Sequence, residues 1–304
     1  MIRESPPFAV SQYTTPSLTF EQDIEIFERV GVEGLEVLES KLSKDPAVAR
    51  RQLSLLRDSP VDLVSVQPDA HSPYPHIMTA PDQPREPRER LALYQQTIDL
   101  FSECFPGQQI TMVSTSGAAP DSDYATAHRE AREYYRRLAD YAADRNVRIG
   151  QEPLCAVYMN QFTFIWTLDE ALSIIHDVDR PNFGLYLDVF HIWREPLICE
   201  RIAALGDRLF GVHICDWPKG EMRHMNDRVL PGDGQIDLPA LFAAIEQTGY
   251  DGAYCMEIFS DESLPDSLWS MDPAVVLRRG MEGFRAAWKA RPVGQFANAS
   301  PNVP

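Results

Sequence analysis

The sequence predicts an α/β protein that folds as a single (β/α)₈ barrel, the TIM-barrel architecture. Short β-rich runs alternate with amphipathic stretches along the chain. Eight such pairs fit within the 304 residues, which suits one closed barrel. A doubly wound sheet is the structural rival, but it would need a glycine-rich phosphate loop after the first strand. The segment VSQYTTPS, which follows that strand, offers none.

The strand predictions rest on short runs rich in apolar, β-branched and aromatic residues, most of which end in a polar residue. In chain order these runs are FAVSQY at 8–13, GLEVLE at 34–39, DLVSVQ at 62–67, QITMVS at 109–114, VRIGQE at 147–152, FGLYLD at 183–188, LFGVHI at 209–214 and GAYCMEI at 252–258.

The helix predictions rest on helical periodicity and on residues that begin or end helices. Apolar residues recur at helical spacing with Arg and Glu between them, most clearly in 122–145. Ser122, Thr167 and Asp237 are predicted N-caps, and Gly31 is expected to end a helix. Helices are predicted near 19–30, 44–57, 86–104, 122–145, 167–178, 196–205, 238–248 and 273–290.

Composition limits the class of protein. Five scattered cysteines without CxxC spacing indicate free thiols in a reducing cytoplasm, which is the predicted location. The N-terminus lacks the pattern of a signal peptide, and no apolar run is long enough to span a membrane. The net charge of −17 argues against nucleic-acid binding. Residues 1–290 are expected to form the barrel domain, and residues 291–304 a flexible C-terminal tail.

Four polar residues each follow an apolar run in the second half of the chain: Glu152, Asp188, His213 and Glu257. In a (β/α)₈ barrel the carboxyl ends of the strands surround one cavity, so these side chains should converge there. Three buried carboxylates would repel one another unless a cation lies between them. With one imidazole, they suit a divalent ion. Mn²⁺ is the first choice, with Mg²⁺, Co²⁺ or Zn²⁺ as alternatives.

The same residues carry a family resemblance. QEP at 151–153, LDVFH at 187–191, VHICD at 212–216 and ME at 256–257 resemble the xylose isomerase-like TIM barrel superfamily. That group includes sugar phosphate isomerases and epimerases and the AP endonuclease family 2 type. The resemblance covers roughly residues 20–287. It implies that Glu152, Asp188, His213 and Glu257 are the metal ligands, and that relatives often form homo-oligomers; a partner subunit is the alternative.

Further residues are predicted to bind substrate. Arg228, in NDRVLPGDGQID, resembles an arginine that reaches the substrate or the metal shell, and the alternative is a surface arginine in a turn. His191 resembles a substrate-binding histidine, and the alternative is a residue that orients Asp188. His71 resembles a pocket histidine, with a plain loop position as its alternative. Trp217 is a candidate for packing on a sugar face, with rim packing as its alternative.

The resemblance implies chemistry next to a carbonyl of a small carbohydrate. Glu152 and Glu257 are the predicted acid–base pair, removing and returning a proton through an enediolate in an isomerase or epimerase. The alternative is a dehydratase or lyase that expels a β leaving group from a keto-sugar or cyclitol. Ketose 3-epimerases place a second glutamate six positions after the first; here that position is Tyr158, which counts against a free-ketose 3-epimerase.

Two other classes are less well supported. An AP endonuclease would need a histidine after the fourth strand and an Asp-x-His after the seventh. Here those places hold STSGAAP and Asp227–Arg228–Val229. A binding module without catalysis is the remaining alternative, and a metal titration would distinguish it, since such a module need not hold an ion.

Overall fold

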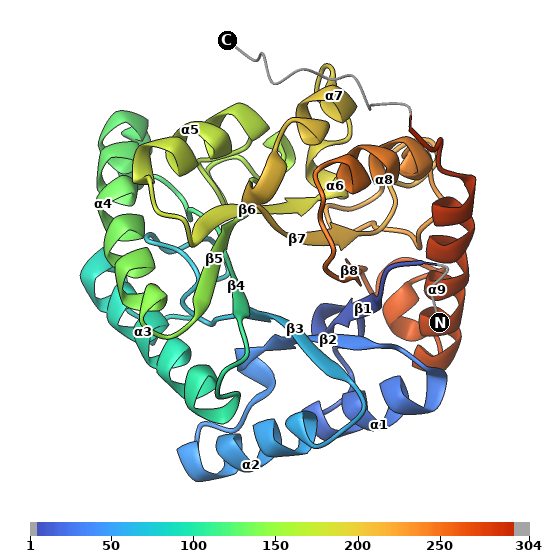
Figure 1. Ribbon diagram of the computed structural model, residues 1–304, viewed down its shortest axis with the longest axis horizontal. Coiled ribbons are helices and arrows are strands. Elements are labelled where there is room, and N and C mark those ends of the chain that lie inside the picture. The colour runs from blue at the N-terminus through green and yellow to red at the C-terminus, as the bar shows by residue number, and fades with distance from the viewer. Residues whose placement is uncertain (1–4, 295–304) are drawn as a thin grey trace.

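The chain closes into a barrel of parallel strands (Figure 1). The computed structural model describes residues 5–294. The strands hydrogen-bond in the order β1 to β8, and β8 pairs back onto β1. This confirms the predicted single (β/α)₈ barrel. The strands are β1 Phe8–Ser11, β2 Gly34–Leu38, β3 Asp62–Gln67, β4 Ile110–Ser114, β5 Val147–Gln151, β6 Phe183–Asp188, β7 Leu209–Ile214 and β8 Tyr254–Met256.

Helices follow the strands and form the outer layer of the molecule (Figure 1). Their order agrees with the predicted alternation, with one addition: the single turn α6 directly after β6. This turn was not predicted, because four residues are too few to show helical periodicity. The α-helices are α1 Phe20–Val30, α2 Pro46–Arg57, α3 Pro87–Cys104, α4 Tyr124–Ala143, α5 Leu168–Val178, α6 Val189–Ile192, α7 Ile198–Ala203, α8 Leu238–Gln247 and α9 Pro273–Ala290.

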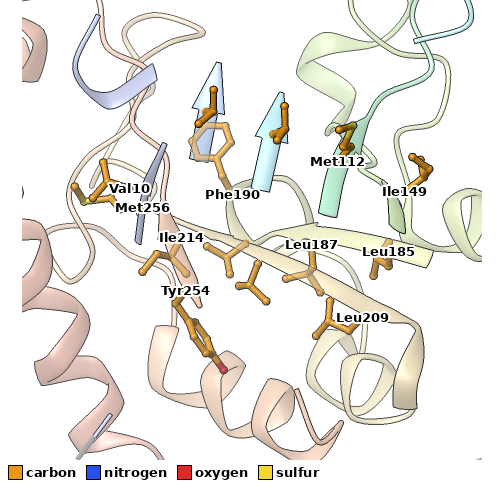
Figure 2. Close-up of a cluster of buried hydrophobic side chains, with 14 of the residues drawn as sticks. Val10, Met112, Ile149, Leu185, Leu187, Phe190, Leu209, Ile214, Tyr254 and Met256 are labelled. Atoms are coloured by element: carbon orange, nitrogen blue, oxygen red, sulfur yellow. The ribbon is translucent and has the colours of Figure 1, made fainter. Parts of the chain in front are cut away.

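The two faces of each strand have different surroundings. In β6, Leu185 and Leu187 belong to the buried apolar cluster drawn in Figure 2. Tyr186 and Asp188 point the other way, into the barrel, where the Tyr186 ring lies 4.5 Å from that of His213. Since side chains alternate along a strand, one six-residue run supplies both the core and the interior of the barrel.

The helix starts agree with the predicted caps in two of three places. The side chains of Thr167 and Asp237 accept backbone N–H groups at the starts of α5 and α8. The prediction for Ser122 was wrong, because α4 is capped by Asp123, whose side chain accepts the N–H of Thr126. Ser122 instead has a φ of 57° in the preceding turn. At the end of α1, Gly31 takes the left-handed conformation with a φ of 80°, as expected for a glycine that ends a helix.

The predicted domain boundary at residue 290 is the last residue of α9. Of the predicted tail, residues 295–304 lie outside the described part of the chain. Between residues 5 and 294, no helix has both the length and the apolar character needed to cross a membrane.

Candidate metal centre at the carboxyl ends of the strands

The four residues predicted from the strand ends come together inside the barrel. Glu152 follows β5, Asp188 ends β6, His213 lies in β7 and Glu257 follows β8. Each can offer one ligand atom so that all four atoms lie within 4.8 Å of one another. All four residues are buried. The convergence follows from the parallel sheet, since its strands end at the same rim.

His213 lies in the middle of this cluster. Its Nδ1 is 3.0 Å from Glu152 Oε1 and 3.6 Å from Glu257 Oε2. The two carboxylates come from strands three places apart around the ring, and both face the same side of the imidazole. The fourth residue, Asp188, pairs with His213 in the register of β6 and β7.

The two carboxylate oxygens of Asp188 have different partners, which explains why an apolar strand ends in an aspartate. Oδ1 accepts the N–H of Phe190 at 2.8 Å and so caps the short helix α6. Oδ2 faces the cluster, 2.8 Å from Arg228 Nη1 and 3.3 Å from His191 Nε2. Because the α6 turn begins at once, His191 folds back over the carboxylate three residues before it.

A loop after β7 brings Arg228 over the cluster. Asp216 and Val229 form an antiparallel bridge that folds the loop back onto the strand end. Arg228 then donates from Nη1 to Asp188 and, at 3.0 Å, to Glu257 Oε2. The arginine predicted to reach substrate or the metal shell is therefore bonded to two of the proposed ligands.

Two aromatic rings lie close to that guanidinium. Its Cζ lies 4.4 Å from the ring centre of Phe190 and 4.9 Å from that of Phe259. Trp217 stacks on Phe190 with 4.6 Å between the ring centres, so Phe190 contacts both the predicted substrate-binding tryptophan and the arginine. Buried cation–π contacts of this kind stabilise a fixed position of the charged group.

The two predicted histidines differ in their placement. Nε2 of His191 is 3.3 Å from both Asp188 Oδ2 and Arg228 Nη2, while its buried Nδ1 has no partner among the described residues. Burial lowers the pKa of His191 to about 3, so its ring is neutral. His71 lies after β3, with Nδ1 2.8 Å from the carbonyl of Pro68 and its ring 5.6 Å from that of His76. His71 therefore lies outside the cluster.

Burial and mutual repulsion shift the ionisation of the cluster. Burial raises the pKa of Glu257 to about 8; His213 and Arg228 oppose this rise, and Glu152 adds to it. Burial also raises the pKa of Glu152. Burial acts against ionisation of Asp188 as well, but Arg228, His191, His213 and the N–H of Phe190 together outweigh it and hold the pKa of Asp188 below its usual value. Without an added cation, the site therefore keeps a proton that a carboxylate in water would release.

The cluster contains residues that the sequence did not reveal as functional. Glu36 of β2 is fully buried and lies 2.9 Å from His213 Nε2. Gln67, at the end of β3, donates to Glu257 Oε1 at 3.3 Å. Burial raises the pKa of Tyr13, and Glu257 adds to this rise. A charged residue in an otherwise apolar strand was the available signal for Glu36.

The donor set fits a divalent cation. Three carboxylates and one imidazole converge, and burial denies them the solvation that would otherwise stabilise their charge. Oxygen-rich sites with one nitrogen suit moderately hard ions such as Mn²⁺ or Mg²⁺. A neighbouring group, Glu36, His213 and Cys255, also brings ligand atoms together, but it shares His213 with the main cluster.

Comparison with known proteins identifies relatives. A family model described as "Xylose isomerase-like TIM barrel" matches residues 24–287. An L-ribulose 3-epimerase of Methylomonas sp. (strain DH-1) is 34% identical over 134 residues, 44% of this chain and 43% of that protein. A 3-dehydroshikimate dehydratase of Pseudomonas aeruginosa is 28% identical over 254 residues, 80% of this chain and 36% of that protein. The chain thus spans less than half the length of these two relatives.

The fold is also found in solved structures. A protein of Sinorhizobium meliloti 1021 superimposes with a TM-score of 0.75 at 23% sequence identity, covering 92% of this chain and 98% of that one. At this identity the likeness concerns the fold. It agrees with the closed eight-stranded barrel described above.

Proposed function

The chain belongs to the xylose isomerase-like TIM barrel family, and from this premise we propose that it is a divalent-metal-dependent isomerase or epimerase of a sugar or keto-sugar. The relatives are enzymes, an epimerase and a dehydratase among them. The observation that carries the proposal is the convergence of Glu152, Asp188, His213 and Glu257 inside the barrel. These four residues would hold the ion, with Mn²⁺ as the first choice and Mg²⁺, Co²⁺ or Zn²⁺ as alternatives.

A divalent ion bound there supplies Lewis acidity that makes a proton next to a substrate carbonyl easier to remove. The protein's part is to move that proton. Glu152 and Glu257 reach the cluster from β5 and β8, and their carboxylates lie 3.0 Å and 3.6 Å from the same imidazole nitrogen. We assign one to abstraction and the other to return of the proton, which gives epimerisation or isomerisation through an enediolate.

The raised pKa values suit this task. A general base works best when its pKa lies near the working pH, and the pKa of Glu257 is about 8 before a cation is present. That value already includes the lowering by Arg228 and His213, and a bound cation would lower it further, toward neutrality. Arg228 and His191 adjoin Asp188 and are proposed to offer donors to substrate hydroxyls, while Trp217 and His71 remain candidates for substrate contact.

Elimination is the second candidate, and the dehydratase relative supports it because its alignment covers 80% of this chain. The same enolate would expel a leaving group β to the carbonyl if no second acid returned the proton. Tyr158 is relevant here. Its hydroxyl donates to the carbonyl of Met225, and its ring packs edge-on against His191, so no second carboxylate stands at this place.

The test uses isotope exchange. Mn²⁺-loaded protein is incubated in D₂O with a panel of keto-sugars and inososes, and products are followed by NMR and mass spectrometry. We expect deuterium at one carbon of one substrate class, without loss of water for epimerisation and with it for elimination. Chelator-treated protein is the control. Absence of metal binding, together with absence of exchange across the panel, would contradict the proposal and favour a binding module. The homo-oligomer and the cytoplasmic location stay predictions.

A further inference from the structure

Glu36 contacts the back of the histidine in the proposed metal centre. Its carboxylate oxygens lie 2.9 Å and 3.0 Å from His213 Nε2. The opposite nitrogen, Nδ1, is the one that faces Glu152 and Glu257. Glu36 and His213 are both fully buried. The imidazole is therefore held between a carboxylate behind it and the ligand carboxylates in front.

Glu36 is itself held by hydroxyl groups from two other strands. Ser65 Oγ of β3 donates to Glu36 Oε2 at 2.7 Å. The hydroxyl of Tyr186, from β6, donates to the same oxygen at 3.1 Å and lies 3.0 Å from Ser65 Oγ. The two hydroxyls form a closed triangle with one carboxylate oxygen. Gln67 Nε2 donates to the other oxygen, Oε1, at 3.4 Å, so both oxygens of the buried carboxylate are hydrogen-bonded.

The far side of this network borders a cavity. A cavity of about 350 Å³ lies at the amino ends of the strands, and Ser65, Tyr186 and Cys255 are part of its wall. Gly34 and Gly211 also line it and contribute no side chain. Without the two hydroxyls, Glu36 Oε2 would keep only His213 Nε2 as a hydrogen-bond partner among those described here.

We propose that Glu36, fixed by Ser65 and Tyr186, is the positioning residue of the metal centre. It takes the N–H of His213 at Nε2, which leaves the lone pair of Nδ1 directed at the ligand carboxylates and at the ion among them. Partners of this kind orient a ligating histidine and raise its basicity. The inference rests on the proposed function, since it presupposes that the cluster binds a divalent ion.

The first test measures Mn²⁺ affinity by isothermal titration calorimetry. Glu36→Gln keeps the shape of the side chain and removes its charge, and we expect affinity to fall about 10- to 100-fold. Tyr186→Phe removes only the hydroxyl, and we expect a loss of about fivefold. Tyr94→Phe is the matched control, because it removes an equally buried hydroxyl that donates to the carbonyl of Val113. It should leave Mn²⁺ affinity unchanged.

The second test observes the hydrogen bond itself. In Co²⁺-loaded protein, the Nε2–H proton of His213 should give a hyperfine-shifted NMR resonance that exchanges slowly with solvent. Labelling of histidine with ¹⁵N identifies the resonance as an imidazole N–H. In Glu36→Gln we expect the resonance to move and to exchange faster, whereas a purely structural loss of stability would leave it in place.

The outcomes separate this inference from the proposed function. Wild-type protein that binds no divalent ion would contradict the proposed function. Wild-type protein that binds Mn²⁺, with equal affinity and an unchanged resonance in Glu36→Gln, would overturn the role of Glu36. If Glu36→Gln does not fold, as judged by circular dichroism, the comparison of Tyr186→Phe with Tyr94→Phe decides: equal affinities in these two variants overturn the inference.

Discussion

Single residues in this protein are best understood through the charge that surrounds them. Four buried carboxylates, Glu36, Glu152, Asp188 and Glu257, share two cationic partners within the described structure, His213 and Arg228. Burial raises the pKa of two of them, and the neighbouring cations lower the pKa of the other two in spite of burial. The imbalance is the physical reason to expect a metal ion.

The ligand assignment predicts metal content. Wild-type protein should carry about one Mn²⁺ per chain, because the four donors form one site. Asp188→Asn and His213→Ala should each lower occupancy, since each weakens or removes a donor. Elemental analysis after gel filtration is the measurement. Asp227→Asn is the matched control, because Asp227 is equally buried but bonded to Arg223. Full occupancy in both ligand variants would show that the set is wrong.

The acid–base assignment predicts the behaviour of shortened side chains. Glu152→Asp and Glu257→Asp keep the charge and should keep Mn²⁺ binding, but they withdraw the carboxylate by one methylene. A displacement on the order of 1 Å can lower turnover about 10²-fold. If each glutamate acts on one face of the substrate, the two variants should differ. One should exchange the substrate proton with solvent faster than it forms product, and the other should be blocked before the exchange.

The measurement compares the rate at which the substrate proton exchanges with solvent and the rate of product formation. Glu246→Asp, on the exposed face of α8, is the control. Equal loss of exchange and product in both variants would indicate a single base, and elimination would then replace epimerisation as the favoured reaction.

The ion pairs of Arg228 predict that its removal lowers the free energy of unfolding, and that bound metal offsets part of the loss. Arg228→Ala removes the cation that Asp188 and Glu257 share, and a buried charge left without its partner costs about 3–5 kcal/mol in the free energy of unfolding. Saturating Mn²⁺ should restore more stability to this variant than to the wild type. Urea denaturation with and without Mn²⁺ measures both quantities. Arg279→Ala, which breaks an exposed pair with Asp233, should change little. An equally small effect at Arg228 would contradict this account.

At the scale of the element, each strand acts through its alternation. The interior side of β6 carries Tyr186 and Asp188, and the outer side carries Leu185 and Leu187 (Figure 2). The turn α6 that follows completes the arrangement, because its start is capped by Asp188 and it places His191 over that carboxylate. A strand and one helical turn thus position three of the site's side chains.

The start of α4 offers a prediction with an internal comparison. Asp123→Ala should lower the free energy of unfolding by about 0.5–2 kcal/mol, because the first turn loses its cap. Ser122→Ala should change it by less than about 0.5 kcal/mol, since this exposed serine does not cap the helix. Thr167→Ala, at the start of α5, should behave like Asp123→Ala. Chemical denaturation measures all three. A larger loss of stability in Ser122→Ala than in Asp123→Ala would support Ser122 as the cap, as predicted from the sequence.

For the molecule as a whole, the buried carboxylates inside the barrel make both the free energy of unfolding and the affinity for metal depend on pH. The pKa of Glu257 is about 8 in the folded protein without metal, against a usual value of 4.5. Between these values the folded state binds more protons than the unfolded state, so this group's stabilisation is present at low pH and lost as pH rises toward 8. Burial lowers the pKa of His213, but Glu257 and Glu36 outweigh it and raise that pKa, which acts in the same direction.

Metal binding should show the opposite trend. The ion needs deprotonated ligands, so Mn²⁺ affinity should rise between pH 6 and pH 8, by up to about tenfold per unit for each proton released. Calorimetry in buffers of different ionisation enthalpy counts those protons. Glu257→Gln has no proton to release at this position and should show a shallower slope. An affinity that is flat from pH 6 to pH 8 would contradict the raised pKa of Glu257.

The alternation of strands and helices, the closed barrel and the four polar residues at the strand ends could be predicted from the sequence. This was possible because both signals are local: periodicity shows which face is buried, and a polar residue after an apolar run marks a strand end. The prediction was wrong at Ser122, because the neighbouring Asp123 caps α4. It missed α6, because a helix of four residues is too short to show helical periodicity.

Only the tertiary structure decided what surrounds those four residues. Glu36 and His213 are 177 positions apart, and Arg228 meets Asp188 across 40. The aromatic rings beside Arg228 come from α6 and from the segment after β8, and the hydroxyls on Glu36 come from β3 and β6. Such contacts depend on the curvature of the closed sheet and on how the loops fold over its rim. No local pattern records them, because each residue alone looks like an ordinary polar residue in an apolar run.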